Sequence, residues 1–162
     1  ALLLAYIFVS LARLYGLGSE EAFFLQSAPI GSINLRGLLL GGMIIGVLGV
    51  LDDVATTQAA AVHELRLANP SFGFRELYRR GSSVGKEHIT SLVNTLVLAY
   101  IGASFPLLLL FTIYDTPFWV TANSEIIVEE IVRTLVGSIS LIFAVPITTA
   151  LAAYVFGKNK NT

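Results

Sequence analysis

The sequence contains no cysteine, which excludes disulfide bonds, thiolate metal sites and cysteine nucleophiles. It is also poor in charge: Asp, Glu, Lys and Arg make up 13% of its 162 residues, against roughly 25% in a typical soluble domain. The net charge is −1, so the total charge itself says nothing about nucleic acid, and we expect no nucleic-acid partner. Two histidines in the whole chain do not form a histidine metal signature.

What fills the sequence instead is apolar, because hydrophobic residues make up 55% of it. Several stretches are long enough to cross roughly 30 Å of hydrocarbon at about 1.5 Å per residue. They are residues 1–17, 38–57, 89–111 and 131–154. We expect the helix of the second stretch to continue to about Leu67, where Asn69-Pro70 stops it. We therefore predict an all-α fold: a polytopic transmembrane helical bundle of about four spans, forming one region over residues 1–162.

The chain opens at Ala1, inside an apolar stretch. This stretch lacks the basic segment and the small-residue cleavage site of a signal peptide. We therefore expect the C-terminal part of a longer membrane protein, whose first span is cut short. The lipid bilayer is the expected surroundings, and the rest of the longer chain or a paralogous subunit is the expected protein partner.

Loop charges predict the orientation of the bundle. Segment 66–87 and the C-terminal tail are basic, whereas the other two connections are mainly acidic. By the positive-inside rule, segment 66–87 and the C-terminus face the cytoplasm. The basic residues are Arg66, Arg75, Arg79, Arg80, Lys86, Lys158 and Lys160, and the acidic residues are Glu20, Glu21, Asp115, Glu125, Glu129 and Glu130.

Segment 74–81 has two faces when it is drawn as a helix at about 100° per residue. The pattern predicts a short interfacial helix on the inner leaflet, with its arginines near anionic headgroups. An ordinary solvated loop is the alternative interpretation. The apolar face holds Phe74, Leu77, Tyr78 and Gly81, and the polar face holds Arg75, Glu76, Arg79 and Arg80.

In the second span, Gly42, Gly46, Gly49 and Asp53 fall within about 60° of one another on a helical wheel. Glycines at this spacing permit close helix packing in lipid, and we expect the same of Gly102 in the third span. Thr57 and Glu64 continue the glycine face, whereas Asp52, Thr56 and His63 form a second polar stripe about 100° away.

Asp52 and Asp53 are the main functional clue. One Asp at the centre of a membrane helix costs roughly 2.5–3.5 kcal/mol on insertion scales. Two adjacent carboxylates therefore require a partner, a proton, a cation or a water-filled cavity. We expect Asp53 to point into the contact with the third span, near Asn94 or Thr95, and Asp52 to meet water or a cation. The predicted polar site comprises Asp52, Asp53, Thr56, Thr57, Asn94 and Thr95.

Three further polar residues, His63, Glu64 and His88, lie nearer the expected cytoplasmic end of these spans. A histidine titrates near neutral pH, so these residues form a candidate proton relay at the cytoplasmic mouth. A structural role for each histidine is the competing interpretation.

Two segments carry a resemblance to a known family. GVLDDVATTQAAAVHEL at 49–65 and SVGKEHITSLVNTLVLAY at 83–100 are similar, in order and spacing, to the YibE/F-like membrane proteins. The likeness extends over about residues 35–154. It implies a polytopic protein of the bacterial inner membrane, longer than this chain at its N-terminus, and it implies no particular reaction.

The aspartate pair also resembles the Asp-Asp motif of Mg²⁺-dependent polyprenyl-phosphate sugar-phosphate transferases. Thr56 stands where that motif has lysine. The Gly-x-Gly-Asp motif of intramembrane aspartyl proteases is not matched, because the run here is Gly49-Val50-Leu51-Asp52. The leading hypothesis is a permease or transport-type component. A non-transporting membrane scaffold is the alternative, and a transferase-like enzyme the lesser one. We expect no cofactor other than a cation at Asp52 and Asp53.

Overall fold

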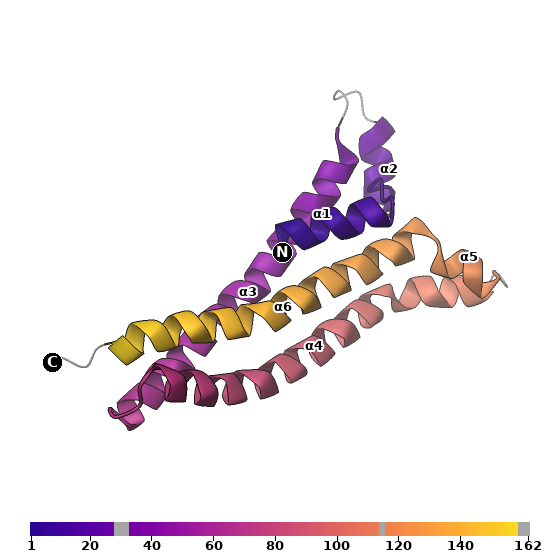
Figure 1. The fold of residues 1–162 in the computed structure, drawn as a ribbon. Helices are drawn as coiled ribbons and strands as arrows, with labels where there is room; N and C mark the ends of the chain where they lie inside the picture. The colour runs from indigo at the N-terminus through magenta and orange to yellow at the C-terminus, as the bar shows by residue number, and fades with distance from the viewer. Residues whose placement is uncertain (28–32, 114–115, 159–162) are drawn as a thin grey trace. The chain divides into compact units, whose positions relative to one another are not determined.

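The computed structural model describes residues 1–27, 33–113 and 116–158. All regular structure in these ranges is helical, which confirms the predicted all-α fold. Asp115 and Lys160, which entered the charge count, lie outside the described residues. The helices, labelled in Figure 1, are α1 (Leu2–Leu11), α2 (Glu20–Ser27), α3 (Leu35–Ala68), α4 (Phe74–Ile113), α5 (Phe118–Ala122) and α6 (Glu125–Lys158).

Three of the described helices, α3, α4 and α6, are long and apolar enough to cross a membrane. The 34 residues of α3 and of α6 correspond to about 51 Å of helix, and the 40 residues of α4 to about 60 Å. The first predicted span contains only α1, whose 10 residues rise about 15 Å. That is half the thickness of the hydrocarbon, so the described helices supply three candidate spans rather than four.

The predicted separate interfacial helix at 74–81 is wrong. These residues form the first two turns of α4, which continues without interruption to Ile113. No proline follows Gly81 until Pro106, and Gly81 and Gly85 pack closely against other helices. The predicted end of the second span is confirmed, because α3 ends at Ala68, directly before Asn69 and Pro70.

The chain divides into two compact units, and α3, α4 and α6 each contribute to both. The first unit comprises Ala1–Val47 and Leu96–Gly137, and the second comprises Leu48–Thr95 and Ser138–Thr162. Apolar side chains form the core of each. Those of the first unit are Ala5, Val9, Leu14, Ala22, Leu35, Leu39, Met43, Val47, Val132 and Val136; those of the second are Val54, Val62, Leu77, Leu141, Val145, Ala152 and Ala153.

In the second unit, glycines of α4 allow the helices to approach closely. A Cβ atom added at Gly81 would lie 2.8 Å from Val62 Cγ2 and 2.9 Å from Thr149 Cγ2. One added at Gly85 would collide with Val145 Cγ1. Small residues at helix contacts are typical of membrane proteins, in which packing rather than hydrophobic burial drives association. Gly81 and Gly85 therefore form the close helix contacts that the sequence pattern predicted for Gly42, Gly46, Gly49 and Gly102.

Much of the apolar surface remains uncovered by the chain itself. None of the most apolar 18-residue stretch of α4 is buried. Large exposed side chains such as Leu98, Ile113 and Leu151 would be unfavourable in water over so wide an area. Lipid chains solvate such a surface, so the exposure agrees with a protein embedded in a membrane.

Candidate functional site

Asp52 and Asp53 lie side by side on α3, and both are exposed. In the described ranges, neither carboxylate has a hydrogen bond or an ion pair. Thr56 Oγ1 donates instead to the backbone carbonyl of Asp52 and, at 3.4 Å, to that of Asp53. The Thr56 hydroxyl therefore bonds to the backbone of its own helix, and both carboxylates remain available to a proton, a cation or water.

The predicted contact between these carboxylates and α4 is not formed. Asn94 and Thr95 are themselves exposed, and Thr95 Oγ1 donates to the Ser91 carbonyl of its own helix at 2.9 Å. Over the ranges that the structure covers, no hydrogen bond joins them to Asp52 or Asp53. The assignment of Asp53 to a buried helix contact is corrected, because α3 turns a different face toward α4 and α6.

That inward face is marked by Gln58, which is only 2% exposed. Its Nε2 donates to the Gly81 carbonyl and to Thr149 Oγ1, both at 2.8 Å, and Thr149 Oγ1 donates to the Val145 carbonyl at 2.6 Å. Gln58 lies about 140° around the helix from Asp53. The polar anchor between α3, α4 and α6 is thus a neutral amide, which no pattern in the sequence predicted. The only sign of this anchor in the sequence is a single glutamine in an otherwise alanine-rich run.

The glycines predicted to pack α3 and α4 meet no neighbouring helix among the described residues. A Cβ atom added at Gly42, Gly46, Gly49 or Gly102 would meet no described atom within 4 Å. The residues that continue the glycine face of α3 in the second unit are exposed as well, so none of the described residues covers this face. We call this face the open face; it comprises Gly42, Gly46, Gly49, Asp53, Thr57 and Glu64.

The candidate relay is not connected in the structure. His63 and Glu64 are exposed on α3, and His88 is exposed on α4. No hydrogen bond joins any two of the three among the described residues. The His63 ring packs against Phe156, with 4.7 Å between the ring centroids, which fits a structural role. Among the described residues no three His, Asp or Glu side chains are grouped to hold a metal ion.

A second carboxylate pair, Glu125 and Glu129, lies in the first turns of α6. Glu125 Oε1 accepts the backbone N–H groups of Tyr15, Gly16 and Leu17 at 2.6, 2.9 and 3.3 Å. Glu129, only 6% exposed, accepts the Gly18 N–H at 3.1 Å. Successive N–H groups that converge in this way form an anion-binding nest.

The loop geometry after α1 makes this nest possible. Arg13 has a φ of 53° and Gly16 a φ of 82°, both in the left-handed region, which ends α1 and turns the following amides toward α6. A side chain at Gly16 would be strained and would also meet the Leu35 carbonyl. In the sequence, Glu125 and Glu129 are recognisable only as acidic residues of a connection. The backbone angles that direct the partner amides toward them have no clear signal in the sequence.

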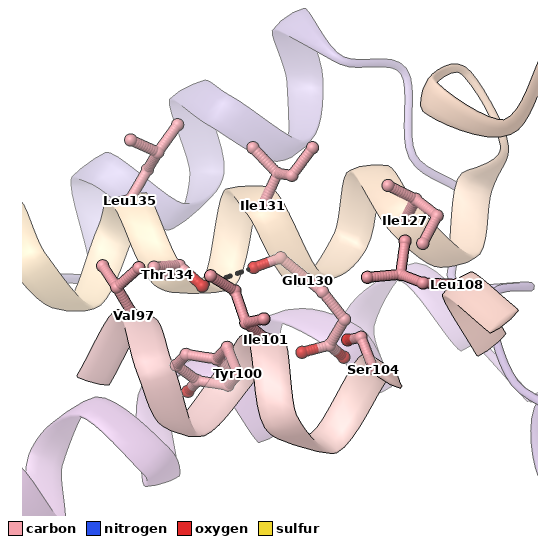
Figure 2. Close-up of a pocket in the computed structure, with 10 residues that line it drawn as sticks. All are labelled: Val97, Tyr100, Ile101, Ser104, Leu108, Ile127, Glu130, Ile131, Thr134 and Leu135. Carbon is pink, nitrogen blue, oxygen red and sulfur yellow. Dashed lines mark hydrogen bonds between the residues drawn. The ribbon is translucent and has the colours of Figure 1, made fainter. Parts of the chain in front are cut away.

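A groove of about 310 Å³ runs between α4 and α6 in the first unit (Figure 2). One carboxylate, Glu130, lines it and is directed toward α4, on the side of Ser104. Arg133 Nη2 lies 3.7 Å from Glu130 Oε1, and Thr134 Oγ1 donates to the Glu130 carbonyl at 2.8 Å. The lining consists of Val97, Tyr100, Ile101, Ser104, Leu108, Ile127, Glu130, Ile131, Thr134 and Leu135.

The basic segment at the start of α4 is partly neutralised by its own glutamate. Arg80 Nε and Arg79 Nη2 each donate to Glu76 Oε1 at 2.7 Å. These bonds, that of Arg80 first and that of Arg79 second, lower the pKa of Glu76. The Arg80 guanidinium also lies 4.7 Å from the centre of the Phe72 ring. Arg75 and Arg79 are exposed at this end of α4.

Comparison with known families gives one result. The family model described as YibE/F-like protein matches residues 1–158. The chain belongs to the YibE/F-like family. The match covers the two polar segments at 49–65 and 83–100, and it also takes in residues 1–34, which precede the stretch on which the resemblance rested. Neither the curated proteins nor the solved structures contain a match to this YibE/F-like chain.

Proposed function

We propose that this YibE/F-like chain is a transport-type membrane component whose polar pathway follows the open face of α3. The observation that carries the proposal is the exposure of Asp52 and Asp53 without a partner in the described chain. A carboxylate kept only for helix packing would be paired in the bundle, because an unpaired one costs roughly 2.5–3.5 kcal/mol in hydrocarbon. Two adjacent carboxylates without a hydrogen-bond or ion-pair partner favour a site that exchanges protons or cations.

The roles follow from charge. Asp52 and Asp53 place two carboxylates next to each other on α3, and the transported proton or cation passes along them. Asn94 and Thr95 on α4 supply neutral oxygens for the same pathway. Helices of a partner, such as a paralogous subunit, cover the open face. The pathway crosses the bacterial inner membrane, with the C-terminus in the cytoplasm and Arg75, Arg79 and Arg80 near anionic headgroups.

The test measures ion flux in proteoliposomes that contain the intact protein with its natural partners. A pH-sensitive dye and a sodium-sensitive dye inside the vesicles report entry of H⁺ and of Na⁺. Asp52→Asn and Asp53→Asn should abolish the flux. Glu87→Gln, which removes an exposed carboxylate from α4, is the matched control and should leave it intact. Flux that is equal in all three variants and in the wild type would refute the proposal.

A second candidate function, a non-transporting scaffold, is favoured by the Gln58 network. A buried amide whose Nε2 group donates two hydrogen bonds and joins three helices rigidifies a bundle, as an assembly platform requires. On this hypothesis the open face of α3 receives another subunit's helix, and Asp52 and Asp53 pair with it. One result distinguishes the two functions. If the protein is a scaffold, its aspartate variants lose co-purifying subunits, and neither the wild type nor the variants show an ion flux.

A further inference from the structure

We propose that the groove between α4 and α6 binds an organic cation with an apolar body, such as an alkylated amine. The groove measures about 310 Å³, within the range of roughly 300–1,000 Å³ typical of small-molecule sites. The proposal concerns the first unit alone and does not rest on the function proposed for Asp52 and Asp53.

The lining has the composition that such a ligand requires. Aliphatic side chains from both helices form most of the wall, and Glu130 contributes the one carboxylate among the lining residues. Tyr100 adds an aromatic ring, whose face attracts cations, and Ser104 and Thr134 add hydroxyl groups (Figure 2). An apolar wall with a few polar groups that fix orientation is the usual construction of a ligand site.

The charge around Glu130 favours a cation. Arg133 is its ion-pair partner in the described structure, yet the 3.7 Å separation exceeds the roughly 2.7–2.9 Å of a charge-assisted hydrogen bond. Arg133 does not line the groove. Glu129, directly before Glu130 in the sequence, and Glu125, five residues before it, are held by the amides of the loop after α1. The first three turns of α6 thus hold three carboxyl groups and one guanidinium, an excess of acidic groups.

Other ligand classes fit the groove less well. A bare metal ion needs several oxygen ligands around it, and the groove offers one carboxylate among apolar walls. An anion would face Glu130 without reaching an arginine in the lining. An ethanolamine lipid carries an ammonium group, but its phosphate would lie next to the same carboxyl groups. A free amphipathic amine combines a positive charge and an apolar body without that penalty.

The experiment titrates the purified intact protein in nanodiscs of phosphatidylcholine with a fluorescent alkylammonium dye. An uncharged analogue of the dye, with the same apolar body, is titrated in parallel. Glu130→Gln should weaken binding of the cationic dye by about tenfold or more, because a charge-assisted contact is lost. The same variant should leave the uncharged analogue unaffected. Glu21→Gln, on the exposed surface of α2, is the matched control and should bind both dyes like the wild type.

A second variant keeps the test decisive if Glu130→Gln does not fold. Leu135→Trp narrows the groove from α6 and should weaken both dyes. Equal binding of both dyes to the wild type, or unchanged cation binding in the Glu130 and Leu135 variants, would overturn the proposal. Displacement of the cationic dye by phosphatidylethanolamine in the nanodisc would also overturn it, because the ligand would then be a membrane lipid.

Discussion

Two pairs of carboxylates on long helices of this chain have opposite surroundings. Glu125 and Glu129 accept four backbone N–H groups from the loop after α1. Asp52 and Asp53 accept none from the described residues and are exposed on α3. A carboxylate with satisfied hydrogen bonds contributes to stability. One without them, in an apolar span, lowers stability unless something outside the described chain meets it. We therefore assign the first pair to folding and the second to function.

The largest loss of stability is expected when the two hydrogen-bonded carboxylates, Glu125 and Glu129, are removed. Glu125→Ala combined with Glu129→Ala removes the acceptors of four N–H groups, and hydrogen bonds to charged groups contribute about 1.5–3 kcal/mol each. We expect the thermal unfolding midpoint in detergent to fall by about 5 °C or more. Glu20→Ala combined with Glu21→Ala is the matched control on α2. A similar midpoint for the two double variants would remove the distinction between the pairs.

A smaller loss of stability is expected when a methyl group is added at Gly18, on the loop side of the nest around Glu125 and Glu129. A Cβ atom at Gly18 would lie 2.5 Å from Glu129 Cδ, so Gly18→Ala forces the carboxylate away and costs about 1–3 kcal/mol. The variant should be partly rescued by Glu129→Ala, which removes the colliding group. A double-mutant cycle by thermal unfolding measures this coupling. Additive losses would show that Gly18 and Glu129 do not meet as described.

Little effect on stability is expected from the exposed pair. Asp52→Asn and Asp53→Asn remove no hydrogen bond of the described structure, so each should change the free energy of unfolding by less than about 0.5 kcal/mol. Asp53→Leu should be tolerated at least as well, since no amide or hydroxyl among the described residues meets this side chain. A large stability loss in Asp53→Leu alone would place Asp53 in a helix contact after all, as the sequence first indicated.

The sequence was sufficient for the class of the fold and for the C-terminal end of α3. Apolar runs long enough for a membrane identify the long helices, and Asn69-Pro70 predicts the stop at Ala68. Run length could not separate a full span from the short α1. The end of α1 depends on left-handed backbone angles at Arg13 and Gly16, and arginine gives no signal for such an angle.

The face that α3 turns inward could not be predicted for a physical reason. Glycines permit a close helix contact but do not require one, and which of them is used depends on the neighbouring helices. Gly81 and Gly85 meet neighbours, whereas Gly46 meets none in the described chain. The rule that ionisable residues face the bundle interior put Asp53 there, yet neutral Gln58 occupies that position. The functional role of the aspartates stays a prediction, because it depends on what covers the open face.

The smallest expected effect concerns Glu76, a carboxylate that is paired but lies on the surface. Arg80 and Arg79 hydrogen-bond to it and lower its pKa below the ordinary value of 4.5. A lowered pKa in the folded state means that the pairing stabilises the protein above pH 4.5 and that this contribution is lost as the pH falls further. Because exposed ion pairs contribute little, Glu76→Gln should shift the unfolding midpoint at pH 7 far less than the loss of Glu125 and Glu129. The residual difference from the wild type should vanish in acid. A shift at pH 7 as large as that of the double glutamate variant would show that pairing alone, without burial or convergent amides, makes a carboxylate structural in this chain.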